Sequence, residues 1–594
     1  MVYALFFWIG EMLMLKRLAQ CVREYKLPSI LTLIFITGEA VIETAIPFIT
    51  ANLVNGIKNG VAMDEILKTG GILVIMALVS LACGGIAAYT CAKASAGFAK
   101  NMRHDMMAKI QQYAFQNIDK FSSSSLVTRL TTDVGNVQMS FMMIIRTAIR
   151  SPLMLIFSVV MAYVMGGFLA TAFVVVIPIL AIGLYLVARK AMPAFRRVFK
   201  KYDRLNESIE ENVRGARIVK GFSREEYEKK KFGIAAEDIC NDFTKAEKIV
   251  ALNTPLMQLC VNINMIFVLL IGAKMTIESG GTSVDVGQIS AMLTYGMQIL
   301  MSLMMLSMIY VMITMSTESA KRICEVLDEE SEMQEKANPV REIKDGSIDF
   351  DGVNFKYSKS AKKNALSDIN LHIKSGMTIG VIGGTGSGKS SLVQLIPRLY
   401  DVTDGSVKVS GIDVRDYGIT ELRNSVAMVL QKNLLFSGTI KENLLWGNEN
   451  ATDEEIIHAC KLAQADSFIE TFPDKYDTKI EQGGTNVSGG QRQRLCIARA
   501  LVKKPKILIL DDSTSAVDTK TDALIRQGFK EFIPETTKII IAQRIASVQD
   551  ADMIVVMENG QVSDVGNHQE LLNRSEIYKE IYEQQTNGGD SDEE

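Results

Sequence analysis

The fold of the C-terminal half is decided by the stretch Gly383-Gly384-Thr385-Gly386-Ser387-Gly388-Lys389-Ser390. The residues before it, 377–382, are mostly apolar and predict a buried strand, and the residues after it, 391–399, predict a helix. A strand, a glycine-rich loop and a helix in this order are the context that a phosphate-binding loop requires. The stretch therefore predicts an α/β domain that holds a nucleoside triphosphate.

The residue types in this loop fit the chemistry of phosphate binding. Glycines allow several backbone N–H groups to surround a phosphate, Lys389 neutralises β- and γ-phosphate charge, and the Ser390 hydroxyl can complete the ligand shell of Mg²⁺. We therefore expect ATP and Mg²⁺ as cofactors. The expected contacts come from the loop and the first turn of its helix, that is from Gly383, Gly384, Thr385, Gly386, Ser387, Gly388, Lys389, Ser390 and Ser391.

A second buried strand is predicted by the apolar run Lys506-Ile507-Leu508-Ile509-Leu510, which ends in the acid pair Asp511-Asp512. A carboxylate at the tip of a strand in such a domain is placed to hold a metal ion directly or through water. We assign this role to Asp511.

The composition divides the chain into two parts. Of its 594 residues, 48% are apolar and 22% charged, which is rich in apolar residues for a soluble protein. Long, nearly uncharged stretches fill the first 320 residues and predict a membrane domain. The net charge of -3 gives no reason to expect nucleic acid as a partner. The eight cysteines are scattered, which argues against a disulfide framework or a zinc site.

A helix needs about 20 mostly apolar residues to cross a bilayer. Six stretches satisfy this requirement: 28–54, 69–92, 141–165, 167–189, 249–273 and 286–315. Two long polar segments between them, 93–140 and 190–248, carry dense positive charge, which places them, both termini and the nucleotide domain in the cytoplasm. Their helical periodicity predicts membrane helices that continue past the lipid and turn back.

These observations predict a multi-domain protein of the cell membrane. Its fold class is a six-helix, all-α transmembrane domain with long cytoplasmic helical extensions, followed by an α/β nucleotide-binding domain. The expected division is an N-terminal segment with an amphipathic helix (1–27), the transmembrane domain (28–319), a linker (320–346), the nucleotide domain (347–583) and an acidic tail (584–594). Residues 1–11 do not resemble a cleaved signal peptide, and Met12 or Met14 is an alternative start.

Two features of the spans bear on what the membrane domain contacts. Glu39 and Glu43 lie one helical turn apart in the first span and are expected to face a water-filled interior or a partner, either as a hydrated lining or as part of a substrate site. The sixth span carries seven methionines on one helical face. Such a face can pack on a neighbouring helix or adapt to substrates of varied shape. The methionines are Met297, Met301, Met304, Met305, Met308, Met312 and Met315.

The motifs together resemble those of the ATP-binding cassette (ABC) superfamily, in particular a half-transporter of the exporter type. The resemblance covers nearly the whole chain, and its most specific mark is the signature Val487-Ser488-Gly489-Gly490-Gln491. In the family this signature binds the γ-phosphate of ATP held by the opposite domain. The resemblance therefore implies that Ser488, Gly489, Gly490 and Gln491 complete the ATP site of a partner chain.

Several single residues of this chain also match functional positions of the family. Tyr357 resembles the aromatic residue that stacks on adenine, and Gln431 resembles the glutamine that contacts Mg²⁺ and the attacking water. Ser515-Ala516-Val517-Asp518 resembles the loop through which each site senses the other. The position of Asp119-Lys120-Phe121 and Gly215-Ala216-Arg217-Ile218-Val219 within the two cytoplasmic segments suggests that they dock on nucleotide domains.

The chain departs from the family pattern at two positions of the same site. Asp512 stands where the family has a glutamate as general base, and Gln543 stands where it has a histidine that contacts the γ-phosphate. A general base must lie within about 2.6 to 3.2 Å of the water it orients, and the shorter aspartate falls outside that reach. Glutamine donates a hydrogen bond but carries no positive charge. We therefore predict a site that binds ATP and hydrolyses it slowly.

An impaired site beside an intact signature is typical of one subunit of a heterodimeric exporter. We expect ATP-driven export of a hydrophobic or amphipathic drug or lipid, with membrane lipid around the chain and the catalytic base supplied mainly by a second half-transporter. A homodimeric exporter in which Asp512 suffices is one alternative. A regulatory ATP-binding subunit that gates rather than pumps is another. The identity of the substrate lies beyond the sequence.

Overall fold

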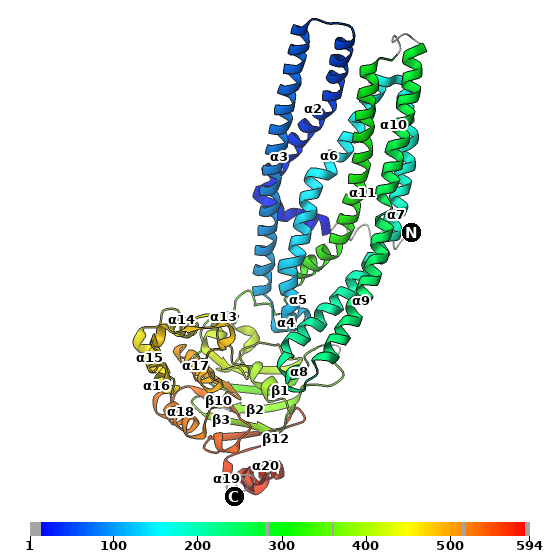
Figure 1. Cartoon of the computed structure of the whole chain (residues 1–594). Helices are drawn as coiled ribbons and strands as arrows, with labels where there is room; N and C mark the ends of the chain where they lie inside the picture. Colours follow the sequence, from blue (N-terminus) through cyan, green and yellow to red (C-terminus); the bar gives the residue numbers. More distant parts are fainter. Residues whose placement is uncertain (1–13, 279–283, 332, 359–360, 514–516, 588–594) are drawn as a thin grey trace. The chain divides into compact units, whose positions relative to one another are not determined.

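The computed structural model describes residues 14–278, 284–331, 333–358, 361–513 and 517–587. Residues 1–11, the alternative start at Met12, Ser515 and Ala516, and the end of the acidic tail lie outside these ranges. The chain forms two compact units, residues 1–111 with 122–329 and residues 112–121 with 330–594 (Figure 1).

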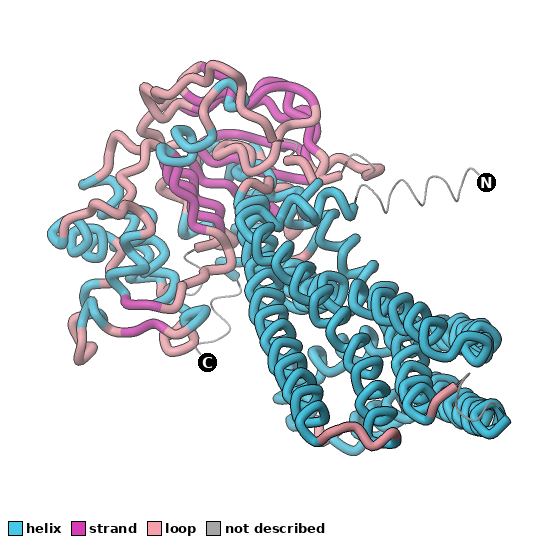
Figure 2. The backbone as a smooth tube through the Cα atoms, turned by 90° about the horizontal axis from the view of Figure 1, so that it is seen from above, coloured by secondary structure: helices cyan, strands magenta, loops and turns pink. Residues whose placement is uncertain are grey.

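The first unit is helical in every described element (Figure 2). A 3₁₀ turn, η1, leads into six long helices. These are η1 (Gln20–Tyr25), α2 (Lys26–Lys58), α3 (Met63–Gln111), α6 (Val134–Gly166), α7 (Thr171–Arg214), α10 (Asn253–Glu278) and α11 (Val286–Asp328).

Five helical ranges of the described residues are long and apolar enough to cross a membrane, namely Met14–Lys58, Met63–Gln111, Ser123–Phe195, Glu225–Glu278 and Val286–Asp328. The third contains two helices, because the chain reverses in the short turn η3 (Gly167–Ala170) between α6 and α7. Gly167 begins this turn with φ 47°, a conformation that favours glycine. Six crossing helices therefore correspond to the six predicted spans.

The helices are longer than a bilayer requires. The 49 residues of α3 extend for about 74 Å at about 1.5 Å per residue, against a hydrocarbon core of about 30 Å. The two polar segments are thus helical continuations, as predicted. Further helices of this unit lie in the same segments: α5 (Ser123–Thr128), the π-helix η2 (Arg129–Asp133), α8 (Ala216–Gly221) and α9 (Glu225–Val250). The helix α4 (Phe115–Phe121) belongs to the second unit.

Close contacts hold the membrane helices together. The hydroxyl of Tyr295 on α11, which is fully buried, donates to the carbonyl of Thr44 on α2 at 2.8 Å. At Gly287 the backbone of α11 approaches α2 so closely that a Cβ would lie 2.2 Å from the Ala51 carbonyl oxygen. The absence of a side chain at Gly287 is therefore what allows α11 to pack here.

The second unit is built on two sheets. A six-stranded sheet has the order β12-β11-β3-β10-β9-β6, in which β12 alone is antiparallel to its neighbour. Its strands are β3 (Thr378–Gly383), β6 (Val426–Val429), β9 (Ile507–Asp511), β10 (Thr537–Ile541), β11 (Met553–Glu558) and β12 (Gln561–Gly566). The second sheet has the order β2-β1-β4-β5 and contains β1 (Ile348–Phe355), β2 (Leu366–Ile373), β4 (Asp404–Val409) and β5 (Ile412–Asp413).

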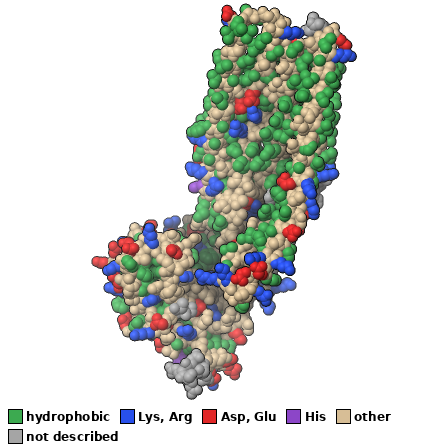
Figure 3. Space-filling view, viewed as in Figure 1, with side chains coloured by type: hydrophobic (Ala, Val, Ile, Leu, Met, Phe, Trp, Pro, Cys, Tyr) green, Lys and Arg blue, Asp and Glu red, His purple; other side chains and the backbone are tan. Residues whose placement is uncertain are grey.

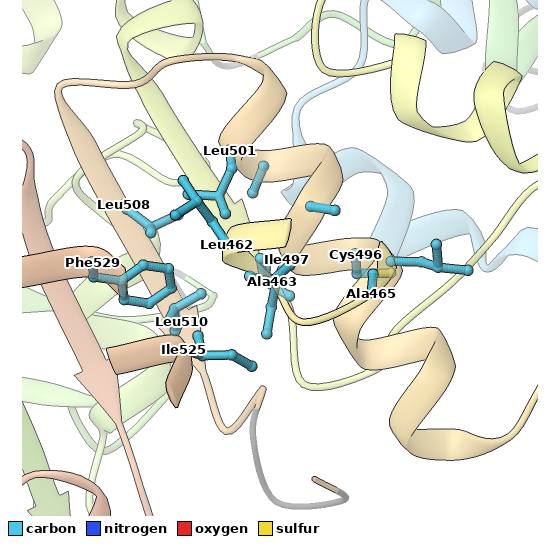
Figure 4. Close-up of a cluster of buried hydrophobic side chains, with 14 of the residues drawn as sticks. Leu462, Ala463, Ala465, Cys496, Ile497, Leu501, Leu508, Leu510, Ile525 and Phe529 are labelled. Carbon is cyan, nitrogen blue, oxygen red and sulfur yellow. The ribbon is translucent and has the colours of Figure 1, made fainter. Parts of the chain in front are cut away.

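Helices cover the larger sheet and complete its core. Figure 4 shows side chains of α15, α17 and α18 meeting those of the fully buried strand β9. Continuous apolar strands of this kind are typical of a parallel sheet that is covered on both faces. The helices and remaining short strands are α12 (Lys389–Gln394), α13 (Ile419–Ser425), β7 (Gly438–Thr439), α14 (Ile440–Leu445), α15 (Asp453–Leu462), α16 (Asp466–Ile469), β8 (Lys479–Ile480), α17 (Gly489–Val502), α18 (Thr519–Phe532), α19 (His568–Arg574) and α20 (Glu576–Asn587).

The fold class predicted from the sequence is confirmed, and one local expectation is wrong. The helix after the glycine-rich loop ends at Gln394 instead of residue 399. Pro397 has no N–H to donate and disfavours a helical residue before it, and Arg398 has a positive φ of 49°. These local effects end the helix early.

Candidate functional site

The glycine-rich loop joins the end of β3 to the start of α12. Gly386 and Gly388 adopt φ values of 80° and 97°, which favour glycine. At Gly388 an added Cβ would also lie 2.8 Å from the Leu366 side chain. The ammonium group of Lys389 donates to the carbonyl oxygens of Gly383 and Gly384, each at 2.8 Å, and thus lies across the loop.

A hydroxyl and a buried carboxylate meet at the base of the loop. Ser390 Oγ donates to Asp511 Oδ1 at 3.0 Å, and Asp511 is only 4% exposed. Burial raises the pKa of Asp511, and the Asp512 charge adds to this, whereas the bond from Ser390 and the Lys389 charge oppose it. A cation at this point would stabilise the ionised form of Asp511.

The donor atoms at Asp511 and Ser390 suit a hard cation, since both are oxygen. Among the residues that the structure describes, no group of three or more His, Cys, Asp or Glu side chains could hold a metal ion. A metal ion at Asp511 would therefore take most of its ligands from water and phosphate, which is the usual arrangement for Mg²⁺ in nucleotide sites.

A cleft of about 640 Å³ opens beside the loop. It is lined by Tyr357, Lys363, Asn364, Ala365, Gly386, Ser387, Gly388, Lys389, Ser390, Ser391, Asn559 and Gly560. Tyr357 is 43% exposed, and its hydroxyl lies 2.7 Å from Ser391 Oγ. The aromatic ring predicted to stack on adenine thus borders the same cleft as the phosphate loop.

Five of these lining residues were not predicted from the sequence, namely Lys363, Asn364, Ala365, Asn559 and Gly560. The available signal was the dipeptide Asn559-Gly560, which is typical of a tight turn and connects β11 to β12. Nothing in the local sequence indicates that this turn lies against the phosphate loop. That contact depends on β11 pairing with β3.

Three predicted site residues meet at one carboxylate. Asp512 Oδ2 accepts hydrogen bonds from Gln543 Nε2 at 2.8 Å and from Gln431 Nε2 at 3.4 Å. The strands β6, β9 and β10 are parallel neighbours, and their carboxyl ends place residues 431, 512 and 543 at one edge of the sheet. Asp512 itself has φ 49°, a conformation that aspartate tolerates better than most residues.

The signature residues form a helix start of their own. Ser488 caps α17, with its Oγ accepting from the Gln491 N–H at 3.2 Å, while Gln491 Oε1 accepts from the Ser488 N–H at 2.9 Å. Gly489 and Gly490 begin the helix, so their N–H groups lack helical partners and can face an anion. In the described part of the chain, none of the four signature residues lines the cleft beside Lys389.

A third set of contacts joins Tyr357 to the predicted docking segment. Tyr400, which is 7% exposed, donates from its hydroxyl to Asp119 Oδ2 at 2.8 Å, and its ring lies edge-on to Tyr357 at 5.2 Å. Gln116 Nε2 donates to the Tyr357 carbonyl at 3.2 Å. Burial raises the pKa of Tyr400, and the bond to Asp119 raises it further. Tyr357, which lines the cleft, therefore contacts Tyr400, and Tyr400 in turn contacts helix α4.

We expect Tyr400→Phe to lower the free energy of unfolding of the nucleotide domain by about 1 kcal/mol, because it removes one hydrogen bond and keeps the ring. For a domain of this size, this corresponds to a fall of about 2 to 4 °C in its thermal midpoint. Asp119→Asn in the Tyr400→Phe background should add little, since the shared contact is already lost. Tyr227→Phe, at a tyrosine that is 61% exposed, is the control and should leave the midpoint unchanged. Full additivity of the two changes would show that the Tyr400–Asp119 contact contributes nothing.

Comparison with known proteins gives two family matches. The family model "ABC transporter transmembrane region" matches residues 29–304, and the model "ABC transporter" matches residues 366–515. The two matches fall in the helical unit and in the unit that holds the glycine-rich loop, respectively.

Similar proteins match over most of their length. The "Uncharacterized ABC transporter ATP-binding protein YfiB" of Bacillus subtilis (strain 168) is 36% identical over 566 residues, covering 95% of this chain and 97% of that protein. A "Fatty acid ABC transporter ATP-binding/permease protein" of Mycobacterium tuberculosis (strain CDC 1551 / Oshkosh) is 31% identical over 480 residues, covering 81% and 75%. The solved structure of a bacterial Atm1-family ABC exporter with ATP bound superposes with a TM-score of 0.82 at 22% identity, covering 95% and 99%.

Proposed function

The chain belongs to the ABC exporters that fuse a transmembrane domain and an ATP-binding domain in one polypeptide. We propose that it is one half of a heterodimeric exporter. It is a multi-pass membrane protein with a cytoplasmic nucleotide-binding domain, and its ATPase activity is coupled to transport. ABC exporters function as dimers.

The observation that carries the heterodimer proposal is the environment of Asp512. Its side chain is one methylene, or about 1.5 Å, shorter than glutamate. Its Oδ2 already accepts from Gln543 and Gln431, so these amides hold the carboxylate at the sheet edge. A carboxylate that is short and held in this way is poorly placed to accept a proton from attacking water. ATP bound by this chain's loop would therefore be hydrolysed slowly.

The remaining residues of the site retain what binding requires. Lys389 and the loop N–H groups neutralise and orient phosphate, Tyr357 offers a ring to the base, and Ser390, Asp511 and Gln431 are the candidate ligands of Mg²⁺. Mg²⁺, when bound, neutralises charge on the β- and γ-phosphates. The chain thus keeps the groups for binding and lacks those for rapid hydrolysis.

The signature of this chain serves the other site of the dimer in this proposal. Ser488 and the free N–H groups of Gly489 and Gly490 present a cluster of donors at the start of α17, and Gln491 fixes the capping arrangement. These donors would close on ATP held by the partner, whose own glutamate and histidine perform the hydrolysis. Transport by the pair then depends on this chain's signature more than on its own Asp512.

A lipid-like or otherwise amphipathic substrate is favoured by the membrane domain. Five of the seven methionines on α11 are more than 40% exposed in this chain, so contacts within the chain do not account for that face. Flexible, polarizable side chains can adapt to apolar molecules of varied shape. A relative 31% identical to this chain is named as a fatty acid transporter, which supports a lipid-like substrate. Packing of this face on the partner chain stays an alternative.

The ATPase rate of the purified full chain tests the proposal. Reconstituted alone in nanodiscs, the chain should hydrolyse ATP at least about 100-fold more slowly than the complex with its partner half-transporter, because general acid–base catalysis contributes about 10² to 10⁴ in rate. The chain alone should still bind ATP, and Lys389→Ala should weaken this binding, whereas Lys374→Ala at an exposed lysine should not.

Rapid phosphate release by the chain alone would instead identify a homodimeric exporter. A complex that binds and hydrolyses ATP without accumulating any lipophilic tracer in proteoliposomes would indicate the regulatory subunit. The partner is sought first among half-transporters encoded beside this chain. The expected partner has a glutamate after its strand-end aspartate and a histidine at the position of Gln543.

A further inference from the structure

A single glutamine of the last helix bridges the backbone that follows strand β10. Gln585 of α20 donates from its Nε2 to the Gln543 carbonyl oxygen at 2.8 Å, and its Oε1 accepts from the Ile545 N–H at 2.9 Å. A carbonyl only accepts and an N–H only donates, so the two bonds also fix the orientation of the Gln585 amide. The contact thus joins two segments that lie 42 residues apart along the chain.

The two bridged backbone groups lie where regular structure offers no partner. Strand β10 ends at Ile541, so the Gln543 carbonyl lies beyond the hydrogen-bond ladder of the sheet. Ile545 begins the 3₁₀ turn η7 (Ile545–Ser547), and the first N–H groups of a helical turn have no acceptor within it. The amide of Gln585 therefore supplies the donor and the acceptor that a main-chain peptide group supplies inside a sheet.

Helix α20 is itself held firmly against the domain. Tyr578, Tyr582 and Gln585 are spaced by four and three residues, so they share one face of the helix. Tyr578 is fully buried, and its hydroxyl lies 2.8 Å from His568 Nδ1. Tyr582 packs against the same hydrophobic cluster that contains Tyr578 and Ile545. The bridge therefore connects the segment after β10 to an element anchored in the core.

The bridged segment carries a residue of the nucleotide site. Gln543 donates from its Nε2 to Asp512 Oδ2 at 2.8 Å, and residue 543 stands at the family position that contacts the γ-phosphate. The side chain of glutamine has three rotatable bonds, so the position of its backbone decides which atoms its amide can reach. A group must be held within about 0.5 Å to act on a bound substrate.

Burial does not account for the bridge. Gln585 is exposed, in a unit whose visible face carries charged side chains of both signs (Figure 3). Its neighbour Gln584 is exposed as well, and it donates to Glu580 of the same helix at 3.2 Å. Replacing Gln585 opens no cavity in the core, so we expect the change to act on the position of residues 543–545 more than on the stability of the domain.

We propose that Gln585 is a positioning residue of the nucleotide site, which holds the backbone of residues 543–545 so that the Gln543 amide faces the γ-phosphate of bound ATP. The inference rests on the role proposed for Gln543. It adds the C-terminal helix to the elements that determine how tightly ATP is held. ADP lacks the γ-phosphate, so its binding does not depend on this bridge.

Equilibrium binding of nucleotides to the full chain in nanodiscs tests this role. The probes, both with Mg²⁺, are AMP-PNP, an ATP analogue that is not hydrolysed, and ADP. Gln585→Ala should weaken AMP-PNP binding at least about threefold, because the segment loses two hydrogen bonds, and should leave ADP binding unchanged. Gln585→Met keeps the length of the side chain without its polar atoms and should behave like Gln585→Ala.

Gln584→Ala removes the neighbouring exposed amide and is the matched control, with no expected change for either nucleotide. Gln543→Ala should reproduce the selective loss of AMP-PNP binding. Combining it with Gln585→Ala should cost little more, because both changes remove the same contact to the γ-phosphate. Thermal midpoints of all variants show whether the fold is retained.

Equal weakening of AMP-PNP and ADP binding, or normal AMP-PNP binding by Gln585→Met, would assign a purely structural role to Gln585 and overturn the inference. Full additivity of Gln543→Ala and Gln585→Ala would overturn it as well. Unaltered AMP-PNP binding by Gln543→Ala would remove the γ-phosphate role of residue 543 and the inference with it. The heterodimer proposal is decided separately, by the ATPase rates of the chain and of the complex.

Discussion

Gly489→Asp is expected to reduce the ATPase rate of the assembled transporter at least about 100-fold, whereas Asp512→Asn reduces it less than about threefold. Gly489 begins α17, where the Ser488 cap leaves its N–H free for an anion. A carboxylate at this position repels the phosphate that those donors would bind. Asp512, in contrast, lies at the site that we propose to be slow, so its removal costs little of the total rate.

The measurement is steady-state phosphate release by the complex in nanodiscs at saturating ATP. Asn567→Asp is the matched control, because it places the same negative charge at the capped start of α19 and keeps the capping interaction. Its rate should equal that of the unaltered complex. The opposite ranking, with Asp512→Asn near background and Gly489→Asp active, would assign hydrolysis to this chain's own site and remove the basis of the heterodimer proposal.

The double variant Asp512→Glu with Gln543→His is expected to raise hydrolysis by this chain's own site by about 10- to 100-fold. The added methylene extends the carboxylate by about 1.5 Å toward the water, and histidine replaces a neutral donor with one that can carry charge. The Gln543 hydrogen bond that holds Asp512 Oδ2 at 2.8 Å is removed at the same time. Each of the two substitutions restores the residue type that the family has at that position.

This gain is measured with the chain alone, so that no partner site contributes. Adding Lys389→Ala to the double variant should abolish it, which shows that the activity comes from this cleft. Glutamate at the left-handed position 512 costs about 1 kcal/mol of stability, which the thermal midpoint reports. If the double variant remains as slow as the original chain, reach and charge at these two positions do not limit hydrolysis.

The sequence predicts the local elements well because their signals are local. Apolar runs specify six spans and the buried strand β9, and the order of strand, loop and helix specifies the α/β domain. The meeting of Gln431, Asp512 and Gln543 follows once the parallel strands β6, β9 and β10 are known to be neighbours. The spans, the strand and the α/β domain depend on periodicity and chain order alone, whereas the meeting of the three side chains also depends on the order of the strands in the sheet.

Contacts between distant elements could not be predicted in this way. The sequence places Glu39 and Glu43 on one helical face, but the pairing with Arg150 depends on how α2 and α6 rotate and slide against each other. The hydrogen bond from Tyr400 to Asp119 depends likewise on how α4 packs in the nucleotide-binding unit. The relative rotation of two helices is set by how their side chains pack together, so it cannot be predicted from the hydrophobic periodicity of either helix alone.

The π-helical turn Arg129–Asp133 continues directly into α6 at Val134. A π turn holds one residue more than an α turn, so it fixes the angular phase of every side chain beyond it. Shortening this turn by one residue would rotate α6 by about 100° about its axis. Arg150 would then point away from both carboxylates, even though its identity is unchanged. The length of this turn thus determines the direction in which Arg150 points within the membrane domain. An insertion or deletion at the turn would change the ion pairs between the membrane helices without changing any residue in them.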